Sequence, residues 1–222
     1  LMKATFGAAG LPQVRYVGIR AAAWRDAARR SALLARTEAL GLPLFVKPAC
    51  AGSSVGITKV RERMTLEVAV DAALAVDATA LVEEAADARE IECAVLEDEQ
   101  GEPEASCPGE VVPGHEFYDY EDKYIDDRSY SILPAVLPEE TSSAVRRMAC
   151  TAFEAVGGAG FARVDFFVER ATGRVLLNEI NSLPGFTPIS MFPKMWEATG
   201  LPLPQLLDRL VASAFRRPLR GR

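Results

Sequence analysis

The segment FARVDFFVERATGRVLLNEIN, residues 161–181, decides the fold because it predicts two strands joined by a tight turn. Apolar and polar residues alternate through FARVDFFVE, which is the period of a strand buried on one face. Ala171-Thr172-Gly173 supplies turn residues, and RVLLNEIN resumes an extended pattern. Two strands this close in sequence most simply form an antiparallel hairpin.

The polar side chains of this hairpin form a candidate metal site. Strict alternation places Arg163 and Asp165 on one face of the first strand, and Leu177, Glu179 and Asn181 on one face of the second. If the polar faces coincide, two carboxylates and an amide oxygen converge with the arginine beside them. Such oxygens are ligands for a hard cation, and magnesium fits best. The alternative is a solvated sheet face on which the arginine makes a cross-strand ion pair.

A second candidate site lies in FVKPACAGSSVGITKV, residues 45–60. Lys47 ends a predicted strand, and a glycine- and serine-rich loop follows it. Such a loop lets backbone amides approach an anion, and the lysine adds a point charge. The order differs from a Walker A loop, in which the lysine follows the glycines and a helix comes next. A plain hairpin connection is the alternative. The loop residues concerned are Gly52, Ser53, Ser54 and Gly56.

The remaining pattern predicts an α+β protein with two subdomains, residues 1–83 and 84–222. Apolar periodicity and turn residues predict helices over 1–10, 25–41, 64–76, 139–156 and 204–215, with a short one around Met195. Strands are expected over 13–19, 43–48, 57–60, 79–84 and 89–98, in addition to the hairpin.

Composition excludes several classes of function. The chain has 222 residues and a formal net charge of -6, which argues against a nucleic-acid or anionic membrane surface. No apolar run approaches the roughly 20 residues that span a bilayer, so a cytoplasmic protein is expected. Its four cysteines are scattered, and the single histidine, His115, lies in a polar segment that suggests a surface loop. These residues do not form the pattern of a zinc cluster or a disulfide framework.

Several motifs together resemble the ATP-grasp region of D-alanine–D-alanine ligases. They are FVKPA…GSSVGI, LVEE…REIECAVL, EFYDYEDKYIDD, ARVDFF and LLNEINSLPGFTPISMFP, in this order. The similarity runs from Lys3 to about Ala214 and corresponds to the central and C-terminal domains of the family. It implies an ATP-grasp fold, in which two α+β subdomains clasp a nucleotide between antiparallel sheets.

The resemblance also implies roles for individual residues. Lys3, Lys47 and the loop Gly52–Gly56 would contact the ATP phosphates, residues 83–86 would line the adenine, and Glu90 would hold the ribose. Asp165, Glu179 and Asn181 would hold two Mg²⁺ ions, for which Mn²⁺ is a possible substitute. Arg163 would stabilise an oxyanion. The full set of implied residues is Arg163, Ser53, Lys123, Tyr124 and Ser190 as catalytic; Lys3, Lys47, Gly52, Ser53, Ser54, Gly56, Glu83, Glu84, Ala86, Glu90 and Lys123 for ATP; and Asp165, Glu179 and Asn181 for metal.

The implied reaction joins two D-alanines for cell-wall synthesis through an acyl phosphate made from ATP. In the family, a tyrosine at the position of Tyr124 accompanies D-alanine rather than D-lactate as the second substrate. Homodimers are common there. Two alternatives remain open: a nucleotide-binding ATP-grasp fragment that does not turn over alone, and another ATP-grasp carboxylate–amine ligase.

Overall fold

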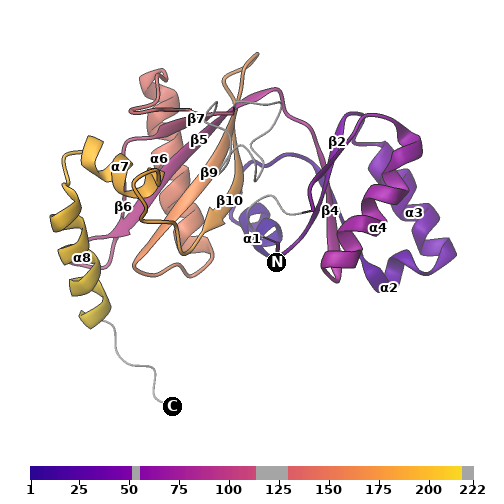
Figure 1. The fold of residues 1–222 in the computed structure, drawn as a ribbon, viewed down its shortest axis with the longest axis horizontal. Helices are drawn as coiled ribbons and strands as arrows, with labels where there is room; N and C mark the ends of the chain where they lie inside the picture. Colours follow the sequence, from indigo (N-terminus) through magenta and orange to yellow (C-terminus); the bar gives the residue numbers. More distant parts are fainter. Residues whose placement is uncertain (52–55, 114–129, 217–222) are drawn as a thin grey trace. The chain divides into compact units, whose positions relative to one another are not determined.

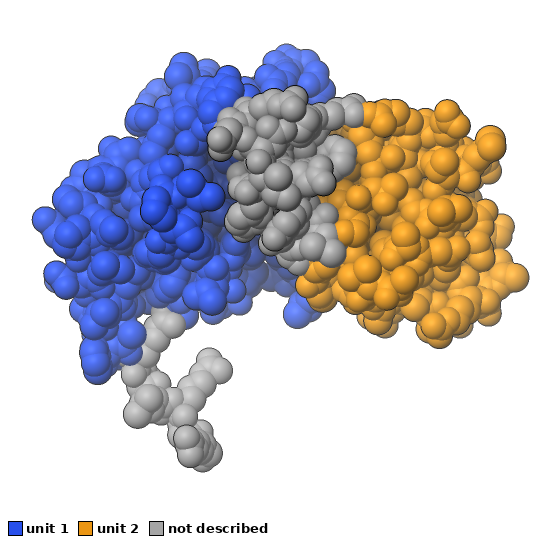
Figure 2. All heavy atoms as spheres, in the orientation of Figure 1, with its two compact units in different colours: residues 1–13, 87–112, 130–222 blue, residues 14–86, 113–129 orange. Residues whose placement is uncertain are grey.

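The computed structural model describes residues 1–51, 56–113 and 130–216, and its contacts divide the chain into two compact units (Figures 1 and 2). The smaller unit consists of Val14–Ala86 with Pro113–Ser129, and the larger of Leu1–Gln13, Asp87–Val112 and Tyr130–Arg222. The contacts thus divide the chain after Ala86 and assign the first helix to the larger unit. The expected domain boundary after residue 83 remains a prediction.

The smaller unit is a four-stranded antiparallel sheet covered by helices. Its strands follow the spatial order β1-β4-β2-β3. Its elements are β1 (Tyr16–Arg20), α2 (Ala21–Trp24), α3 (Ala27–Glu38), β2 (Leu44–Pro48), β3 (Thr58–Val60), η1 (Arg63–Thr65), α4 (Leu66–Val76) and β4 (Thr79–Glu84).

Alternate strand residues and one face of each helix form the core of the smaller unit. Val17 and Ile19 of β1 and Val46 of β2 pack in one cluster with Leu33 of α3 and Val70 of α4. Burial of such side chains is the main favourable term in the folding of a unit of this size.

The larger unit contains a six-stranded sheet, whose main path is β10-β9-β5-β7-β8, with β6 paired to β5. Every pairing between its strands is antiparallel. Its elements are α1 (Met2–Ala8), β5 (Ala88–Glu97), β6 (Pro103–Ala105), β7 (Gly109–Val112), β8 (Tyr130–Ile132), α6 (Glu139–Ala155), β9 (Phe161–Glu169), β10 (Val175–Asn181), α7 (Met191–Ala198) and α8 (Leu203–Arg216).

One face of this sheet is buried beneath α1 and α6. Phe6 of α1 and Phe153 of α6 belong to the same core cluster as Cys93 of β5 and Val164 and Phe166 of β9. Since neighbouring residues on a strand point to opposite faces, the polar residues between them lie on the other face. This second face is called the open face below.

The α+β class is confirmed, and most predicted elements form near their expected positions. The helix expected over 25–41 forms as the shorter α3, which begins at Ala27 because Asp26 caps it by accepting a hydrogen bond from the Arg29 amide at 2.9 Å. The strand expected over 13–19 is shorter and begins at Tyr16. The short strands β6, β7 and β8 were not predicted individually. In the described part of the chain, no helix is both long and apolar enough to span a bilayer.

Candidate functional site

Polar side chains of the open face form two adjacent rows across β5, β9 and β10. In the first row, Glu92 is paired in register with Asp165, which is itself paired with Glu179. In the second row, Arg163 lies between Ala94 and Asn181. The predicted hairpin is therefore present, and Asp165, Glu179, Asn181 and Arg163 occupy adjacent register positions on it.

A bulge in β10 corrects the predicted face of Leu177. The register shifts between Leu177, which lies opposite Phe166, and Glu179, which lies opposite Asp165. Leu177 is fully buried in the core, so it does not share a face with Glu179 as strict alternation predicted. The extra residue, Asn178, absorbs one position, as in a β-bulge. Bulges often re-aim side chains next to functional sites, and here the bulge brings Glu179 and Asn181 to the open face.

Arg163 is bound along one edge by Asp165. Its Nε donates to Oδ1 and its Nη2 donates to Oδ2, both at 2.7 Å. Burial alone would lower the pKa of Arg163, but the nearby carboxylates of Asp165, Glu92 and Glu179 outweigh burial and raise that pKa above its ordinary value. The guanidinium therefore stays charged, and it is surrounded by more carboxylates than it can neutralise.

The oxygen donors of the open face fit a hard divalent ion by their chemistry. Asp165 and Glu179 supply carboxylates and Asn181 supplies an amide oxygen, which also accepts the Leu183 amide at 3.2 Å. Over residues 1–51, 56–113 and 130–216, no group of three or more His, Cys, Asp and Glu side chains is arranged to hold a metal ion. The candidate set differs from such a group because its third member is an asparagine.

Ser190 lies immediately before α7 in a tightly folded turn. Its Oγ accepts the Thr187 amide at 3.0 Å and lies 2.9 Å from the Thr187 hydroxyl. A Cβ atom at Gly185 would come within 2.7 Å of the same Oγ, so a side chain at this position would displace the Ser190 hydroxyl. The structure thus holds the Ser190 hydroxyl at a defined position.

In the smaller unit, Lys47 forms an ion pair with Glu83. The Nζ atom lies 2.8 Å from Oε2, and the Glu83 side chain is only 6% exposed. Glu84 accepts hydrogen bonds from the backbone N–H and the Nε of Arg15, at 2.8 and 2.6 Å. Ala86 is half-buried at the end of this unit. Glu84 therefore has a structural role that its position at the end of a strand did not reveal.

Lys3 and Glu90 lie in the larger unit. Lys3 on α1 is 4% exposed, which excludes an ordinary exposed helix lysine as its explanation. Glu90 on β5 is half-buried and lies in register between Val111 and Phe167. Gly56 has a φ of +77°, a conformation that L side chains rarely adopt. The predicted residues Gly52, Ser53, Ser54, Lys123 and Tyr124, and also His115, fall outside the described residues.

Glu92 was not among the site residues predicted from the sequence. This residue is 8% exposed on β5, and its Oε2 lies 3.3 Å from the Nε of Arg163. One signal was present, because alternation places Glu92 on the same face as Glu90, in a strand whose following residues are apolar. Its proximity to Arg163 depends on the pairing of β5 with β9, two strands that are far apart in sequence.

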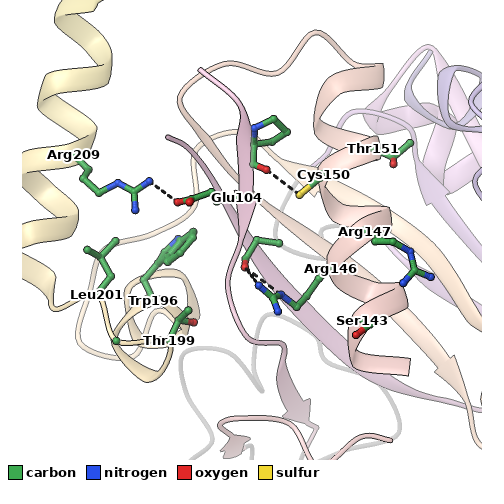
Figure 3. A pocket seen from close by; sticks show the side chains of 13 residues that line it. Glu104, Ser143, Arg146, Arg147, Cys150, Thr151, Trp196, Thr199, Leu201 and Arg209 are labelled. Carbon is green, nitrogen blue, oxygen red and sulfur yellow. Dashed lines mark hydrogen bonds and ion pairs between the residues drawn. The ribbon is translucent and has the colours of Figure 1, made fainter. Parts of the chain in front are cut away.

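A cavity of about 840 Å³ in the larger unit is a weaker candidate (Figure 3). It carries several arginines, but two of them are bound to acceptors of the protein itself. Arg209 pairs with Glu104 at 2.6 Å, and Arg146 donates to the Ala105 carbonyl at 3.1 Å. None of the residues predicted from the sequence lines this cavity. The open face of β5, β9 and β10 is therefore the better site.

Curated relatives and solved structures resemble the chain over most of its length. A D-alanine–D-alanine ligase of Kineococcus radiotolerans is 50% identical over 98% of the chain and 59% of the relative. One from Chlorobaculum parvum is 51% identical over 82% of the chain and 49% of the relative. The chain thus spans about half to three fifths of these relatives.

Among solved structures, the D-alanine–D-alanine ligase of Coxiella burnetii has a TM-score of 0.78 at 39% identity, over 96% of this chain and 55% of that one. The VanG D-Ala:D-Ser ligase of Enterococcus faecalis has a TM-score of 0.81 at 34% identity, over 95% and 59%. The protein-family model described as D-ala D-ala ligase C-terminus matches residues 5–212 of this chain. Because this match includes both units and every strand of the open face, the chain belongs to the D-alanine–D-alanine ligase C-terminal family.

Proposed function

We propose that this chain contains the nucleotide-binding and ligating part of a D-alanine–D-alanine ligase. Such an enzyme uses ATP to join two D-alanines and releases ADP and phosphate. Membership of the family and about 50% identity to ligases support this assignment. The number of metal ions, their exchange for Mn²⁺, a cytoplasmic location and a homodimer remain predictions from the resemblance.

The observation that carries the proposal is the cluster on the open face. Arg163 is held by Asp165 in a two-point contact, and Glu179 and Asn181 occupy neighbouring register positions. A fixed cation beside excess carboxylates suits a site that binds both a metal ion and a developing oxyanion. An ordinary cross-strand ion pair needs only one carboxylate for each cation.

The proposed reaction proceeds in two steps. The carboxylate of the first D-alanine attacks the γ-phosphorus of ATP, giving an acyl phosphate and ADP. The amine of the second D-alanine then attacks the acyl carbon, the amine loses a proton, and phosphate leaves as the peptide bond forms. A free carboxylate is a poor electrophile, which is why the activating phosphate is needed.

This chain's residues would bind and orient the reactants. Lys47 would contact the ATP phosphates, Arg163 would donate to the oxyanion of the tetrahedral intermediate, and the Ser190 hydroxyl would bind the second D-alanine carboxylate. Mg²⁺ held by Asp165, Glu179 and Asn181 would neutralise phosphate charge.

The decisive experiment measures phosphate release from Mg-ATP with and without D-alanine. Release that depends on D-alanine supports the ligase, and dipeptide detected by mass spectrometry completes the assignment. Nucleotide binding without release indicates a non-catalytic ATP-grasp unit. Replacing the second D-alanine with D-serine or D-lactate tests the second substrate, and D-serine is included because one structural relative is a D-Ala:D-Ser ligase.

Glu179→Gln tests the metal role within the same assay. The variant should lower magnesium-dependent nucleotide binding or turnover by more than roughly 100-fold, because it removes a charged ligand but keeps the side-chain shape. The fold should persist, since Glu179 is exposed. Glu154→Gln on α6 is the matched control, as this glutamate is also exposed and lies in the same unit. Unfolding of the Glu179 variant with unchanged activity per folded molecule would contradict the role.

A further inference from the structure

A buried carboxylate from a third strand contacts the arginine of the candidate site. Glu92 of β5 lies in the same row as Asp165 and Glu179, and its Oε2 is 3.3 Å from the Nε of Arg163. Its neighbours Ile91 and Cys93 are fully buried in the core on the other face. The backbone that carries Glu92 is therefore held by core packing on one side and by β9 along its edge.

Arg163 is consequently held by carboxylates from two strands. Asp165 lies two residues away on the same strand and takes the Nε and Nη2 edge. Glu92 approaches from the adjacent strand. Asp165 occupies only the Nε and Nη2 edge of the planar guanidinium, and among the described residues none accepts a hydrogen bond from Nη1. A contact from a second strand restricts rotations that Asp165 alone would permit.

Burial of the Glu92 carboxylate carries a cost in free energy. Asp165 already neutralises Arg163, and burying another carboxylate costs desolvation free energy. The Glu92 side chain is nevertheless only 10% exposed. In some proteins, buried ionic groups of this kind define one conformation rather than add stability.

We propose that Glu92 is a positioning residue for Arg163. It fixes the plane of the guanidinium so that the donors left free by Asp165 meet the oxyanion that forms during ligation. This role rests on the proposed ligase function. A small displacement of a catalytic donor is enough to lower the rate strongly, because stabilisation of the transition state requires donors already in place.

The kinetic test compares Glu92→Gln with Glu110→Gln in the D-alanine-dependent phosphate assay. Glu110 is the matched control, because it is also a buried carboxylate of this sheet and binds Arg89 at 2.8 and 2.5 Å. We expect Glu92→Gln to lower kcat by about 10- to 100-fold, with the KM values for Mg-ATP and D-alanine changed by less than about threefold. Glu92→Asp, which keeps the charge on a shorter side chain, should recover part of the loss. Glu110→Gln should leave kcat near that of the unchanged chain.

Two kinetic outcomes would overturn the proposal. Equal losses of kcat in the Glu92 and Glu110 variants would mean that only general stability was affected. A rise in the KM for Mg-ATP at constant kcat would make Glu92 a nucleotide or metal contact instead.

A second measurement does not depend on turnover. The Nε–Hε NMR signal of Arg163, identified by its loss in Arg163→Lys, should shift in Glu92→Gln, and its hydrogen exchange should accelerate by more than about tenfold. Glu110→Gln should leave this signal unchanged. An unaltered Arg163 signal in Glu92→Gln rejects positioning. If the unchanged chain shows no D-alanine-dependent phosphate release, the ligase function fails, while the NMR result still decides whether Glu92 holds Arg163.

Discussion

Each of the two units buries a cation against carboxylates, but the charge balance differs between them. In the smaller unit, Lys47 is paired with Glu83, one charge against one. In the larger unit, Arg163 contacts Asp165 at 2.7 Å and Glu92 at 3.3 Å. Glu179 lies in the same row as these two carboxylates.

The difference concerns the charge that each cluster offers to a ligand. The Lys47–Glu83 pair is neutral, so an anion that binds Lys47 must compete with Glu83. Among the described residues, the cluster around Arg163 has more carboxylates than cations, and a bound divalent ion would relieve that excess. The two clusters therefore differ in the ligand charge that each would favour.

The two tryptophans allow each unit to be followed separately, because Trp24 lies in the smaller unit and Trp196 in the larger. Both indole side chains are buried. Trp24→Phe leaves a fluorescence reporter only in the larger unit, and Trp196→Phe leaves one only in the smaller. These two backgrounds serve for the stability predictions below.

The largest effect is expected from Arg163→Met. It removes the cation that contacts the largely buried carboxylates of Asp165 and Glu92, which should lower the free energy of unfolding of the larger unit by about 3–5 kcal/mol. Urea unfolding followed by Trp196 measures this loss. Arg147→Met, at an exposed position on α6, is the control. A loss no greater than in the control would mean that the carboxylates do not depend on Arg163.

Lys47→Met should have a smaller effect, confined to the smaller unit. The change removes the 2.8 Å ion pair with one largely buried carboxylate, Glu83, so we expect a loss of about 2–3 kcal/mol. Trp24 fluorescence reports it, with exposed Arg36→Met as the control. If Trp196 reports the same loss, the two units unfold as one and the contrast between their clusters cannot be assigned to separate units.

Magnesium should distinguish the clusters by a still smaller change in the free energy of unfolding. At a free concentration of roughly five times its dissociation constant, Mg²⁺ should stabilise the larger unit by about 1 kcal/mol and leave the smaller one unchanged. Glu179→Gln should remove the gain. Equal stabilisation of both units would show that the excess charge on the open face does not select the ion.

Alkylation of Cys93 gives an independent check on the larger unit. It is the last prediction because no effect on stability is expected from it. Burial raises the pKa of this thiol to about 12, so in the folded state it is both enclosed and protonated near neutral pH. Its alkylation, followed by peptide mapping, should therefore require opening of the larger unit. Arg163→Met should accelerate it, whereas Lys47→Met should not. Rapid labelling of Cys93 in the unchanged chain would contradict its enclosure.

Much of the candidate site could be predicted because it lies on a local hairpin. The alternation in residues 161–169 correctly placed Arg163 and Asp165 opposite the core residues Val164 and Phe166. The bulge at Asn178 could not be predicted, because an extra residue leaves the composition of a strand unchanged and only shifts its register. The placement of Leu177 was wrong for this reason.

Contacts between distant segments could not be predicted from local sequence patterns. Glu92 approaches Arg163 only because β5 pairs with β9, and Glu83 approaches Lys47 only because β4 lies beside β2. Lys3 is buried although it is the second residue of the chain's first helix, α1, a place where a lysine is usually exposed. Burial of a charged residue depends on what packs over it, which a single helix does not reveal.

Residue order alone determined the α+β class, the hairpin and the types of donor atom on it, because strand period and side-chain chemistry are local properties. Only the tertiary structure decided which carboxylates surround Arg163 and which one binds Lys47. Those distances arise from strand pairings across tens of residues, and ionic interactions depend on the final separation and burial of the charges rather than on their spacing along the chain.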